Sequence, residues 1–313
     1  MFQIRKAIHL GGVALMLACC LVTFPRAVKA IETPLVIAVS TPVIADIVRN
    51  VAGDRADEVY SVVPENADPH SWEPSPKDMT RAMESSTFVY MGASLEPFVE
   101  SGGWRRAVDD AGIPVLMLSE HIDLIQIDET IDHGDHVHDL RAGDPHVWLD
   151  PRMVLSIIAV IETHLAMIDP DGSVDYSDSA SRYASEIADL DAELEQDLLG
   201  IPDDRRKLVV FHDAYRYFAA RYDFEVIGVV IPNLDGEPAA QDIVDLLSII
   251  DQSGVGVVFA EPQFGDDILS LFQDDSQLVV GMLMSDSFTS DVSTYVDLMR
   301  FNRDSLVAHL SNG

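Results

Sequence analysis

Cysteine is almost absent from this chain of 313 residues, and the two that occur, Cys19 and Cys20, stand inside its first apolar segment. If that segment is removed, no disulfide can form. Basic residues are also scarce, because 20 Lys and Arg stand against 53 Asp and Glu, which gives a formal net charge of -33. A protein of this charge repels phosphate backbones and anionic lipid headgroups. We therefore expect no nucleic-acid partner.

Apolar residues are not scarce, and they make up 48% of the chain. A disordered chain combines high charge with few apolar residues, so this proportion indicates a folded core beneath an acidic surface. The length suffices for two domains of about 150 residues each. The composition thus predicts a globular protein of two domains.

Residues 1–30 have the pattern of a secretory signal peptide. Arg5 and Lys6 precede an apolar run over residues 7–24, and Ala30 ends the segment. This order of basic, apolar and small residues is typical of a cleaved signal. We therefore expect a periplasmic protein whose mature chain begins after residue 30. An alternative is a lipid anchor on Cys19, since residues 16–19 resemble a lipoprotein processing site.

Short β-rich runs alternate with helical patterns in both halves of the chain. Such alternation is typical of parallel sheets that helices cover on both faces. We therefore predict an α/β fold with two lobes, each a parallel sheet flanked by helices. The expected strands cover residues 35–40, 58–63, 87–91, 114–118, 208–211, 225–230, 256–260 and 278–283, and the expected helices include residues 43–51, 76–84, 241–252 and 292–310.

The two halves are joined by a segment in which apolar residues recur every three or four positions from residue 176 to residue 198. This spacing predicts an amphipathic helix of about seven turns, roughly 40 Å long. A helix of that length is a stiff connection. We therefore expect an N-terminal lobe over residues 31–172, a linker helix over residues 173–200 and a C-terminal lobe over residues 201–313.

The pattern Asp-Pro-His-x-Trp occurs twice, over residues 68–72 and 144–148, and a proline follows each copy. Proline restricts the backbone, so His70 and His146 are expected in rigid turns at helix entrances. Rigid histidines suit metal ligation. A single histidine in such a place is more often a hydrogen-bonded structural residue, so the case for ligands depends on what else accompanies them.

Two further residues stand where predicted strands end. His212 follows the strand expected over residues 208–211, and Asp286 follows the strand expected over residues 278–283. Open α/β sheets bind ligands at the carboxyl ends of their strands. Three imidazoles and one carboxylate would form a tetrahedral site for a divalent cation, with zinc the natural occupant. Asp286 could instead cap a helix or turn.

Other residues have weaker claims to a role at the metal. Glu261 also follows a predicted strand, and it is a candidate for an acceptor behind a ligand, an alternative ligand or a solvated acid. The stretch 132–139 contains His133, His136 and His138 without periodicity. We expect a mobile surface loop there, which is either an auxiliary metal site or a polar tract.

Together these motifs resemble the solute-binding proteins of ABC importers for zinc and manganese. The two Asp-Pro-His-x-Trp copies, Phe-His-Asp-Ala-Tyr over residues 211–215 and Phe-Ala-Glu-Pro-Gln-Phe over residues 259–264 carry the resemblance, which spans nearly all of the chain after residue 30. It implies two α/β lobes joined by one rigid helix, with the metal in the cleft between them. It also implies a monomeric binding protein that is not an enzyme and that delivers its metal to a membrane permease.

Carried over by position, the resemblance implies that His70 and His146 are ligands from the first lobe, and that His212 and Asp286 are ligands from the second. Manganese-selective members usually have a glutamate where His212 stands, so the histidine favours Zn²⁺. The region around Asp286 is more similar to the manganese and iron branches, which leaves Mn²⁺ or Fe²⁺ as the alternative.

Two functions of other classes compete with metal import. A secreted zinc hydrolase also uses three histidines and an open coordination position. However, neither His-Glu-x-x-His nor His-x-His-x-Asp occurs, and the closest run, residues 136–139, has its aspartate one position too early. A surface adhesin built on the same fold would require lipidation and a host-facing patch.

Overall fold

The computed structural model describes residues 34–100, 103–127, 130–132, 137–139, 142–230, 248, 250, 256–263 and 278–311. The predicted signal peptide and nearly all of the helix expected over residues 241–252 lie outside this part of the chain. The lobe boundaries stay predictions, and we use "first lobe" for residues 34–172 and "second lobe" for residues 201–311.

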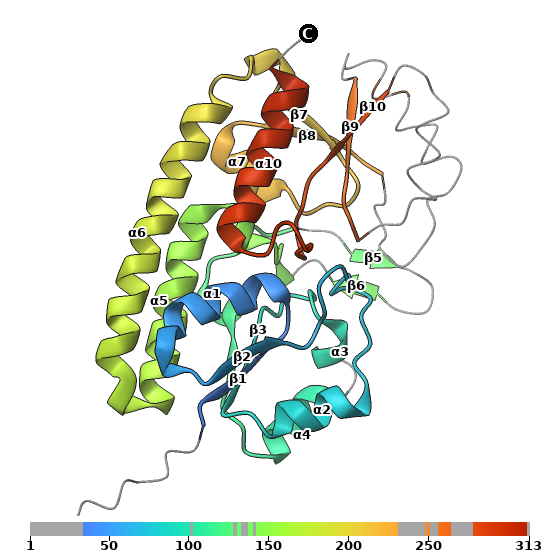
Figure 1. Ribbon diagram of the computed structural model, residues 1–313. Coiled ribbons are helices and arrows are strands. Elements are labelled where there is room, and N and C mark those ends of the chain that lie inside the picture. Colours follow the sequence, from blue (N-terminus) through green and yellow to red (C-terminus); the bar gives the residue numbers. More distant parts are fainter. Residues whose placement is uncertain are drawn as a thin grey trace, which may run out of the picture. The chain divides into compact units, whose positions relative to one another are not determined.

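The first lobe contains a parallel sheet of four strands in the order β2-β1-β3-β4 (Figure 1). Side chains alternate between its two faces because successive residues of a strand point in opposite directions. In β1, Ile37 and Val39 enter the largest hydrophobic core, whereas Ala38 enters a second core on the opposite face. All four predicted strands are confirmed, as β1 (Val36–Val39), β2 (Glu58–Ser61), β3 (Thr87–Tyr90) and β4 (Val115–Met117).

The second lobe repeats this arrangement with the strand order β10-β9-β7-β8. In β9, Val257 and Phe259 point into the largest core, and Val258 and Ala260 point into a third core on the other face. Buried faces on both sides explain why these strands are continuous apolar runs. The predicted strands are confirmed as β7 (Lys207–Val210), β8 (Glu225–Val229), β9 (Val257–Ala260) and β10 (Val279–Met282).

Helices flank both sheets, and several begin with the capping residues expected from their sequence. The Ser75 side chain accepts from the backbone of Asp78, and Asp78 in turn accepts from the backbone of Ser75, so that α2 begins with a capping box. The helix expected from residue 292 begins three residues later, because Thr294 caps it. The helices are α1 (Pro42–Ala52), α2 (Pro76–Met83), α3 (Pro97–Glu100), α4 (Trp104–Asp110), α5 (Pro151–Ile168), α6 (Ser173–Leu198), α7 (Arg216–Tyr222) and α10 (Tyr295–Leu310), with short 3-10 turns at Gly53–Arg55, Leu118–His121, Val147–Leu149, Pro170–Gly172 and Asp203–Arg205.

The long helix α6 connects the lobes, as the periodicity predicts. It runs beside α5, and it packs against α1 of the first lobe and α10 of the second (Figure 1). Its buried face joins the hydrophobic interiors of both lobes into one core. The buried residues are Ser179 and the apolar residues that predict the helix, namely Tyr176, Ala180, Tyr183, Ile187, Leu190, Leu194 and Leu198.

Ion pairs attach α6 to helices on either side of it. The Asp191 carboxylate accepts from Arg152 of α5 (3.1 Å) and from Arg221 of α7 (2.8 Å). Glu193, further along α6, accepts from Arg300 of α10 at 2.9 Å. A single helix is therefore bonded to elements of both lobes through its polar as well as its apolar residues.

Helix α5 is the one helix among the described residues that is long and apolar enough to span a membrane by length and composition. Its buried residues, including Val154, Ile157 and Leu165, belong to the same core as those of α6. The core of a folded lobe accounts for this apolar character.

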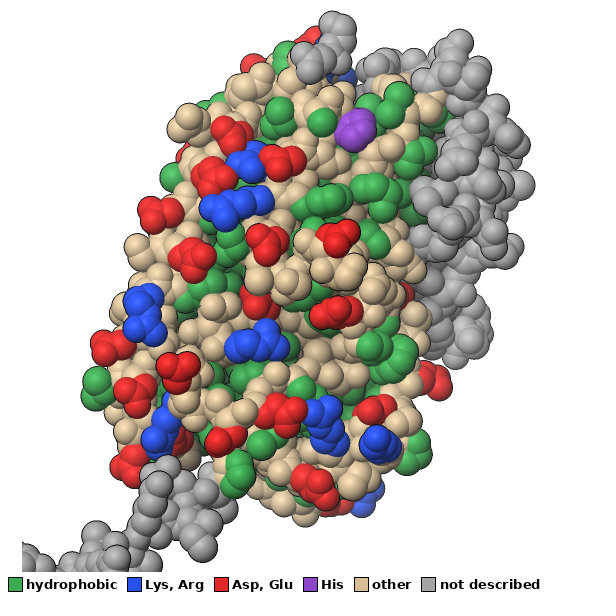
Figure 2. Space-filling model, in the orientation of Figure 1, with side chains coloured by type: hydrophobic (Ala, Val, Ile, Leu, Met, Phe, Trp, Pro, Cys, Tyr) green, Lys and Arg blue, Asp and Glu red, His purple; other side chains and the backbone are tan. Residues whose placement is uncertain are grey.

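The surface has the acidic character that the composition predicts. Acidic side chains are scattered over the face shown in Figure 2, with fewer basic ones between them. The exposed acids Asp175, Asp178, Glu186 and Asp189 lie along α6, on the side opposite its buried residues.

One expectation is corrected near the histidine-rich stretch 132–139, which the sequence predicts to be a loop. Two short antiparallel strands, β5 (Thr130–Asp132) and β6 (Val137–Asp139), pair at its ends, and Ile131 lies opposite His138. The β-branched residues of both segments favour strands over a loop. Residues 133–136 and the side chains of this hairpin lie outside the described part, so the auxiliary role of His133, His136 and His138 stays a prediction.

Candidate metal centre

Both Asp-Pro-His turns have the same local hydrogen bonds. The Asp68 carboxylate accepts from the backbone N–H of His70 (2.9 Å), and the Asp144 carboxylate accepts from that of His146 (2.9 Å). An aspartate that bonds the backbone two residues later forms a tight turn, and the intervening proline stiffens it. The two copies of the motif thus hold their histidines by the same device.

The other two residues follow strands of the second lobe. His212 lies two residues after β7, and Asp286 lies four residues after β10. The segment before Asp286 is held by Asn302 of α10, whose side chain bonds the backbone N–H and the carbonyl of Met284, each at 2.8 Å. The carboxyl edge of this sheet therefore carries both residues toward the first lobe.

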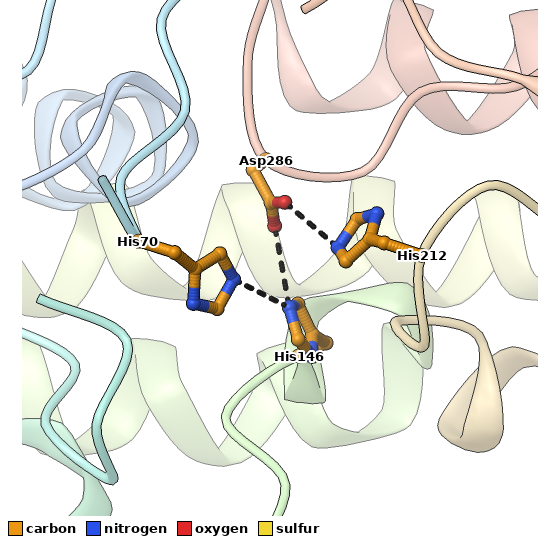
Figure 3. A group of neighbouring side chains, drawn as sticks. All are labelled: His70, His146, His212 and Asp286. Carbon is orange, nitrogen blue, oxygen red and sulfur yellow. Dashed lines mark hydrogen bonds and ion pairs between the residues drawn. The ribbon is translucent and has the colours of Figure 1, made fainter. Parts of the chain in front are cut away.

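The structure brings His70, His146, His212 and Asp286 together (Figure 3). One ligand atom from each lies within 4.8 Å of all the others. The Nε2 atoms of His70 and His146 are 3.3 Å apart. Asp286 places Oδ1 3.6 Å from Nε2 of His146 and Oδ2 3.1 Å from Nε2 of His212. Four residues from segments far apart in the sequence thus form one compact group.

The spacing of these atoms suits a small divalent cation. Ligand atoms about 2.0–2.1 Å from a metal, at the corners of a tetrahedron, lie about 3.3–3.4 Å from one another. Three separations within the group, 3.1, 3.3 and 3.6 Å, are close to that value, and with one ligand atom per residue all four lie within 4.8 Å of one another. All four residues are buried, and Oδ1 of Asp286 accepts no hydrogen bond from any described residue. A buried carboxylate oxygen without a donor is costly unless a cation binds it.

Two of the histidines are oriented by carboxylates behind them. Nδ1 of His146 lies 2.8 Å from Oδ1 of Asp144, and Nδ1 of His212 lies 2.6 Å from Oε1 of Glu261. Each carboxylate accepts a hydrogen bond from Nδ1–H. This tautomer leaves the lone pair on Nε2, the atom that faces the other ligands. Glu261 therefore lies behind His212, outside the group of four.

Glu261 is itself held in place on its other oxygen. Oε2 accepts from Nε2 of Gln263 at 3.0 Å and from the hydroxyl of Ser285. Ser285 directly precedes Asp286, and its hydroxyl also lies 2.9 Å from Oδ2 of that residue. A chain of polar contacts therefore runs from Gln263 through Glu261 to His212 and Asp286.

Burial and neighbouring charge shift the pKa values of these groups in different directions. Burial lowers the pKa of His70 to about 4. Burial also disfavours imidazolium at His146 and His212, but the carboxylates outweigh it and raise the pKa of both, most strongly at His212 beside Glu261 and Asp286. The imidazoles of His146 and His212 in turn overcome the effect of burial and lower the pKa of Asp286. Without a metal, protons on two histidines therefore balance the buried carboxylates.

Comparison with known proteins places this arrangement in a family. A family model described as "ZnuA: Zinc-uptake complex component A periplasmic" matches residues 37–309. The chain belongs to this family. Its members are exported metal-binding components of ABC importers and not enzymes, which agrees with the resemblance noted in the sequence.

Named relatives bind several metals. The chain is 28% identical to "Manganese-binding lipoprotein MntA" of Halalkalibacterium halodurans, over 88% of this chain and 89% of that protein. It is also 28% identical to "Iron-binding protein YfeA" of Yersinia pestis, over 84% of this chain and 82% of that protein.

Solved structures share the fold. The periplasmic zinc-binding protein TroA of Treponema pallidum superposes with a TM-score of 0.76 at 23% identity, covering 90% of this chain and all of that one. A crystal structure of ZnuA superposes with a TM-score of 0.75 at 25% identity, covering 89% of this chain and all of that one.

Several residues around the group escape prediction from sequence. Asp144 is visible as part of the repeated motif, but nothing in the motif distinguishes it from Asp68, whose carboxylate accepts from the backbone of His70 and from the hydroxyl of Ser71. Tyr217 of α7 reaches the first lobe, where its hydroxyl accepts from the N–H of Ile125 (2.8 Å) and donates to the carbonyl of Asp144 (3.0 Å). Such contacts join residues that are distant in the sequence, so no local pattern signals them.

Proposed function

We propose that this protein captures Zn²⁺ between its lobes with His70, His146, His212 and Asp286 and delivers it to the permease of an ABC importer. The observation that carries the proposal is the buried group of three Nε2 atoms and one carboxylate. Three nitrogen ligands and one oxygen suit a borderline cation such as zinc. The family description, which names zinc uptake, supports the same metal.

A manganese or iron importer is the second candidate. Two observations favour it: the relatives named above are described as manganese-binding and iron-binding, and Asp286 supplies a hard oxygen ligand. Manganese and iron accept imidazole as well as carboxylate ligands. The choice of metal therefore depends on relative affinity and on the supply of each ion.

Metal competition tests both the site and its metal. Purified metal-free protein would be titrated with Zn²⁺, Mn²⁺ and Fe²⁺ against a chromophoric chelator. We expect one tight site, with zinc bound most tightly, and a loss of at least 10- to 100-fold in affinity for His70→Ala, His146→Ala, His212→Ala and Asp286→Ala. A preference for manganese or iron at the same four residues would establish the second candidate.

The control is His309→Ala, since His309 lies on α10 and its ring bonds the carbonyl of Ser305. We expect this variant to bind metal as the parent does. If the four ligand variants also matched the parent, the metal would be bound elsewhere in the chain and the proposal would be wrong.

The cellular setting follows the family. We propose that the protein acts as a monomer, which sedimentation velocity of the metal-bound form would test. Several relatives are named lipoproteins, which supports the lipid-anchored alternative through Cys19. Mass spectrometry of the mature N-terminus would distinguish an acylated cysteine from a chain that begins after residue 30.

A further inference from the structure

The segment that carries Asp286 belongs to the second lobe, yet the first lobe holds it on both sides. Nε1 of Trp148 donates to the carbonyl of Ser285 at 2.9 Å. The backbone N–H of Asn66 donates to the hydroxyl of Ser287 at 2.7 Å. The residues before and after Asp286 are therefore each fixed by a donor from the opposite lobe.

The Asp286 carboxylate faces the other ligands, with Oδ2 3.1 Å from Nε2 of His212 and Oδ1 3.6 Å from Nε2 of His146, and few other groups orient it. Among the described residues, Oδ1 accepts no hydrogen bond, and the one hydroxyl near Oδ2 is that of Ser285. The second lobe holds the backbone of this segment at Met284, through Asn302, and holds the Ser285 side chain through Glu261, whereas the Ser285 carbonyl is bonded by the first lobe. The position of the carboxylate therefore depends on how the Ser285 peptide is held.

Trp148 differs from the other two tryptophans of the described residues because its indole N–H donates a hydrogen bond. Nε1 of Trp104 and Nε1 of Trp72 are buried, and neither donates to any described residue. Trp72 occupies the same place in the first Asp-Pro-His-x-Trp motif that Trp148 occupies in the second. Among the three indoles, that of Trp148 alone donates a hydrogen bond to a described residue, and the acceptor belongs to the opposite lobe.

Trp148 is also rigidly placed. It is 1% exposed, and its ring meets that of His146 edge-on, with centroids 5.5 Å apart. Its carbonyl accepts from the hydroxyl of Tyr295 at 2.7 Å. A side chain confined in this way presents its N–H in one direction, as positioning of another group requires.

We propose that Trp148 is a positioning residue for Asp286, so that the first lobe controls the one negatively charged ligand that the second lobe contributes. This inference rests on the metal-binding function proposed above. Separation of the lobes breaks the bond from Trp148 to Ser285 and frees the carboxylate, so the metal loses its anionic ligand as soon as the lobes part. Retention and release of metal are thereby linked to lobe contact through one indole N–H.

The first test compares Trp148→Phe with Trp104→Phe. Both positions are 1% exposed, and both substitutions remove the same atoms from a buried site, but only Trp148 loses a hydrogen bond. We expect Trp148→Phe to raise the dissociation constant for Zn²⁺ about tenfold and to alter the visible absorption spectrum of the Co²⁺-loaded protein, which reports ligand geometry. We expect Trp104→Phe to change neither, whatever it does to the melting temperature.

The second test is a double-mutant cycle with Asp286→Ala. If Trp148 acts through Asp286, adding Trp148→Phe to Asp286→Ala should raise the dissociation constant less than twofold further. If Trp148→Phe only disturbed the fold, it would raise the dissociation constant by the same factor in the parent and in Asp286→Ala. Equal effects of Trp148→Phe with and without Asp286 would overturn the inference.

A third variant covers the case in which Trp148→Phe does not fold. Site-specific replacement of Trp148 by benzothienylalanine keeps a bicyclic ring of nearly the same shape and puts a sulfur atom, which cannot donate a hydrogen bond, in place of the N–H. Parent-like zinc affinity and Co²⁺ spectrum in this variant would overturn the inference. If the parent itself bound none of the three metals, the proposed function would fail instead, so the two failures are distinguishable.

Discussion

The carboxylate oxygen Oδ1 of Asp144 accepts two hydrogen bonds from a single residue, His146: one from its backbone N–H at 2.9 Å and one from its ring Nδ1 at 2.8 Å. The corresponding Asp68 bonds the backbone of His70 and the hydroxyl of Ser71. Two copies of one motif therefore share a turn. Among the described residues, the second copy places its carboxylate within hydrogen-bond distance of its histidine ring, whereas Asp68 acts on the pKa of His70 through its charge.

This difference predicts unequal effects of the same substitution. We expect Asp144→Asn to weaken zinc binding about 10- to 100-fold, because the amide keeps the turn and removes the negative charge behind His146. Asp68→Asn should stay within about twofold of the parent, since an amide oxygen can accept the same backbone bond. Chelator competition on both variants provides the measurement. Equal losses would mean that the turn, and not the charge, is what His146 requires.

Metal binding should expel protons. The carboxylates that raise the pKa of His146 and His212 keep these rings partly protonated near neutral pH, and each must lose its proton to bind a metal. We expect release of about one to two protons per Zn²⁺ near pH 7, and affinity that rises about tenfold per pH unit for each proton. Calorimetry in buffers of different ionisation enthalpy counts the protons.

The competition between protons and metal for the histidines should also affect the thermal stability of the metal-bound protein. Bound metal at about 1,000 times its dissociation constant adds about 4 kcal/mol to the free energy of unfolding. We expect the zinc-induced rise in melting temperature to be large at pH 7.5 and to shrink towards pH 5. An equal rise at both pH values would show that carboxylates, rather than His146 and His212, hold the metal.

Asp191 should be a main support of the contact between α6 and the lobes. Arg221 has a side chain only 5% exposed, so Asp191→Ala leaves a buried cation with Glu195 as its remaining partner. We expect a loss of about 3 kcal/mol in the free energy of unfolding, measured by urea denaturation. Asp189→Ala, on the exposed face of the same helix, is the control and should change it by less than about 0.5 kcal/mol. Similar losses in both would remove Asp191 from this role.

Glu96 should make the metal-free protein less stable as pH rises. Burial raises the pKa of this carboxyl from 4.5 to about 7, against the opposing hydrogen bonds from Ser40 and the N–H groups of Met91 and Gly92. A group with a raised folded pKa favours folding at low pH and loses that contribution as pH rises. We expect the difference in unfolding free energy between parent and Glu96→Gln to fall by about 3 kcal/mol from pH 4.5 to pH 8. If the unfolding free energies of the parent and of Glu96→Gln changed in parallel with pH, the prediction would be wrong.

The elements that sequence predicts well here are those whose pattern is local. The eight strands of the two sheets and the helix α6 were predicted within about two residues, because short apolar runs mark strands that are buried on both faces and a spacing of three or four marks a helix. The hairpin of β5 and β6 was missed because its three-residue strands contain Asp and His and form no apolar run, unlike the equally short β4, whose residues are all apolar.

The four residues of the metal group could be nominated from sequence, since each follows a turn motif or a strand. Their meeting could not be derived from such patterns, because His70 and Asp286 are brought together by the packing of both lobes against α6 and by hydrogen bonds between the lobes. The roles of their neighbours depend on the same packing. Trp148 and Ser285 are 137 residues apart, and Trp72 and Trp148 occupy the same position of the repeated motif. Sequence by itself determined the strands of the two sheets, the long helix α6, the acidic composition and the candidate ligands, because these reflect local geometry and composition. Only the tertiary structure decided which aspartate backs a histidine and which tryptophan holds Asp286, because hydrogen bonds between distant segments exist only once the chain has folded.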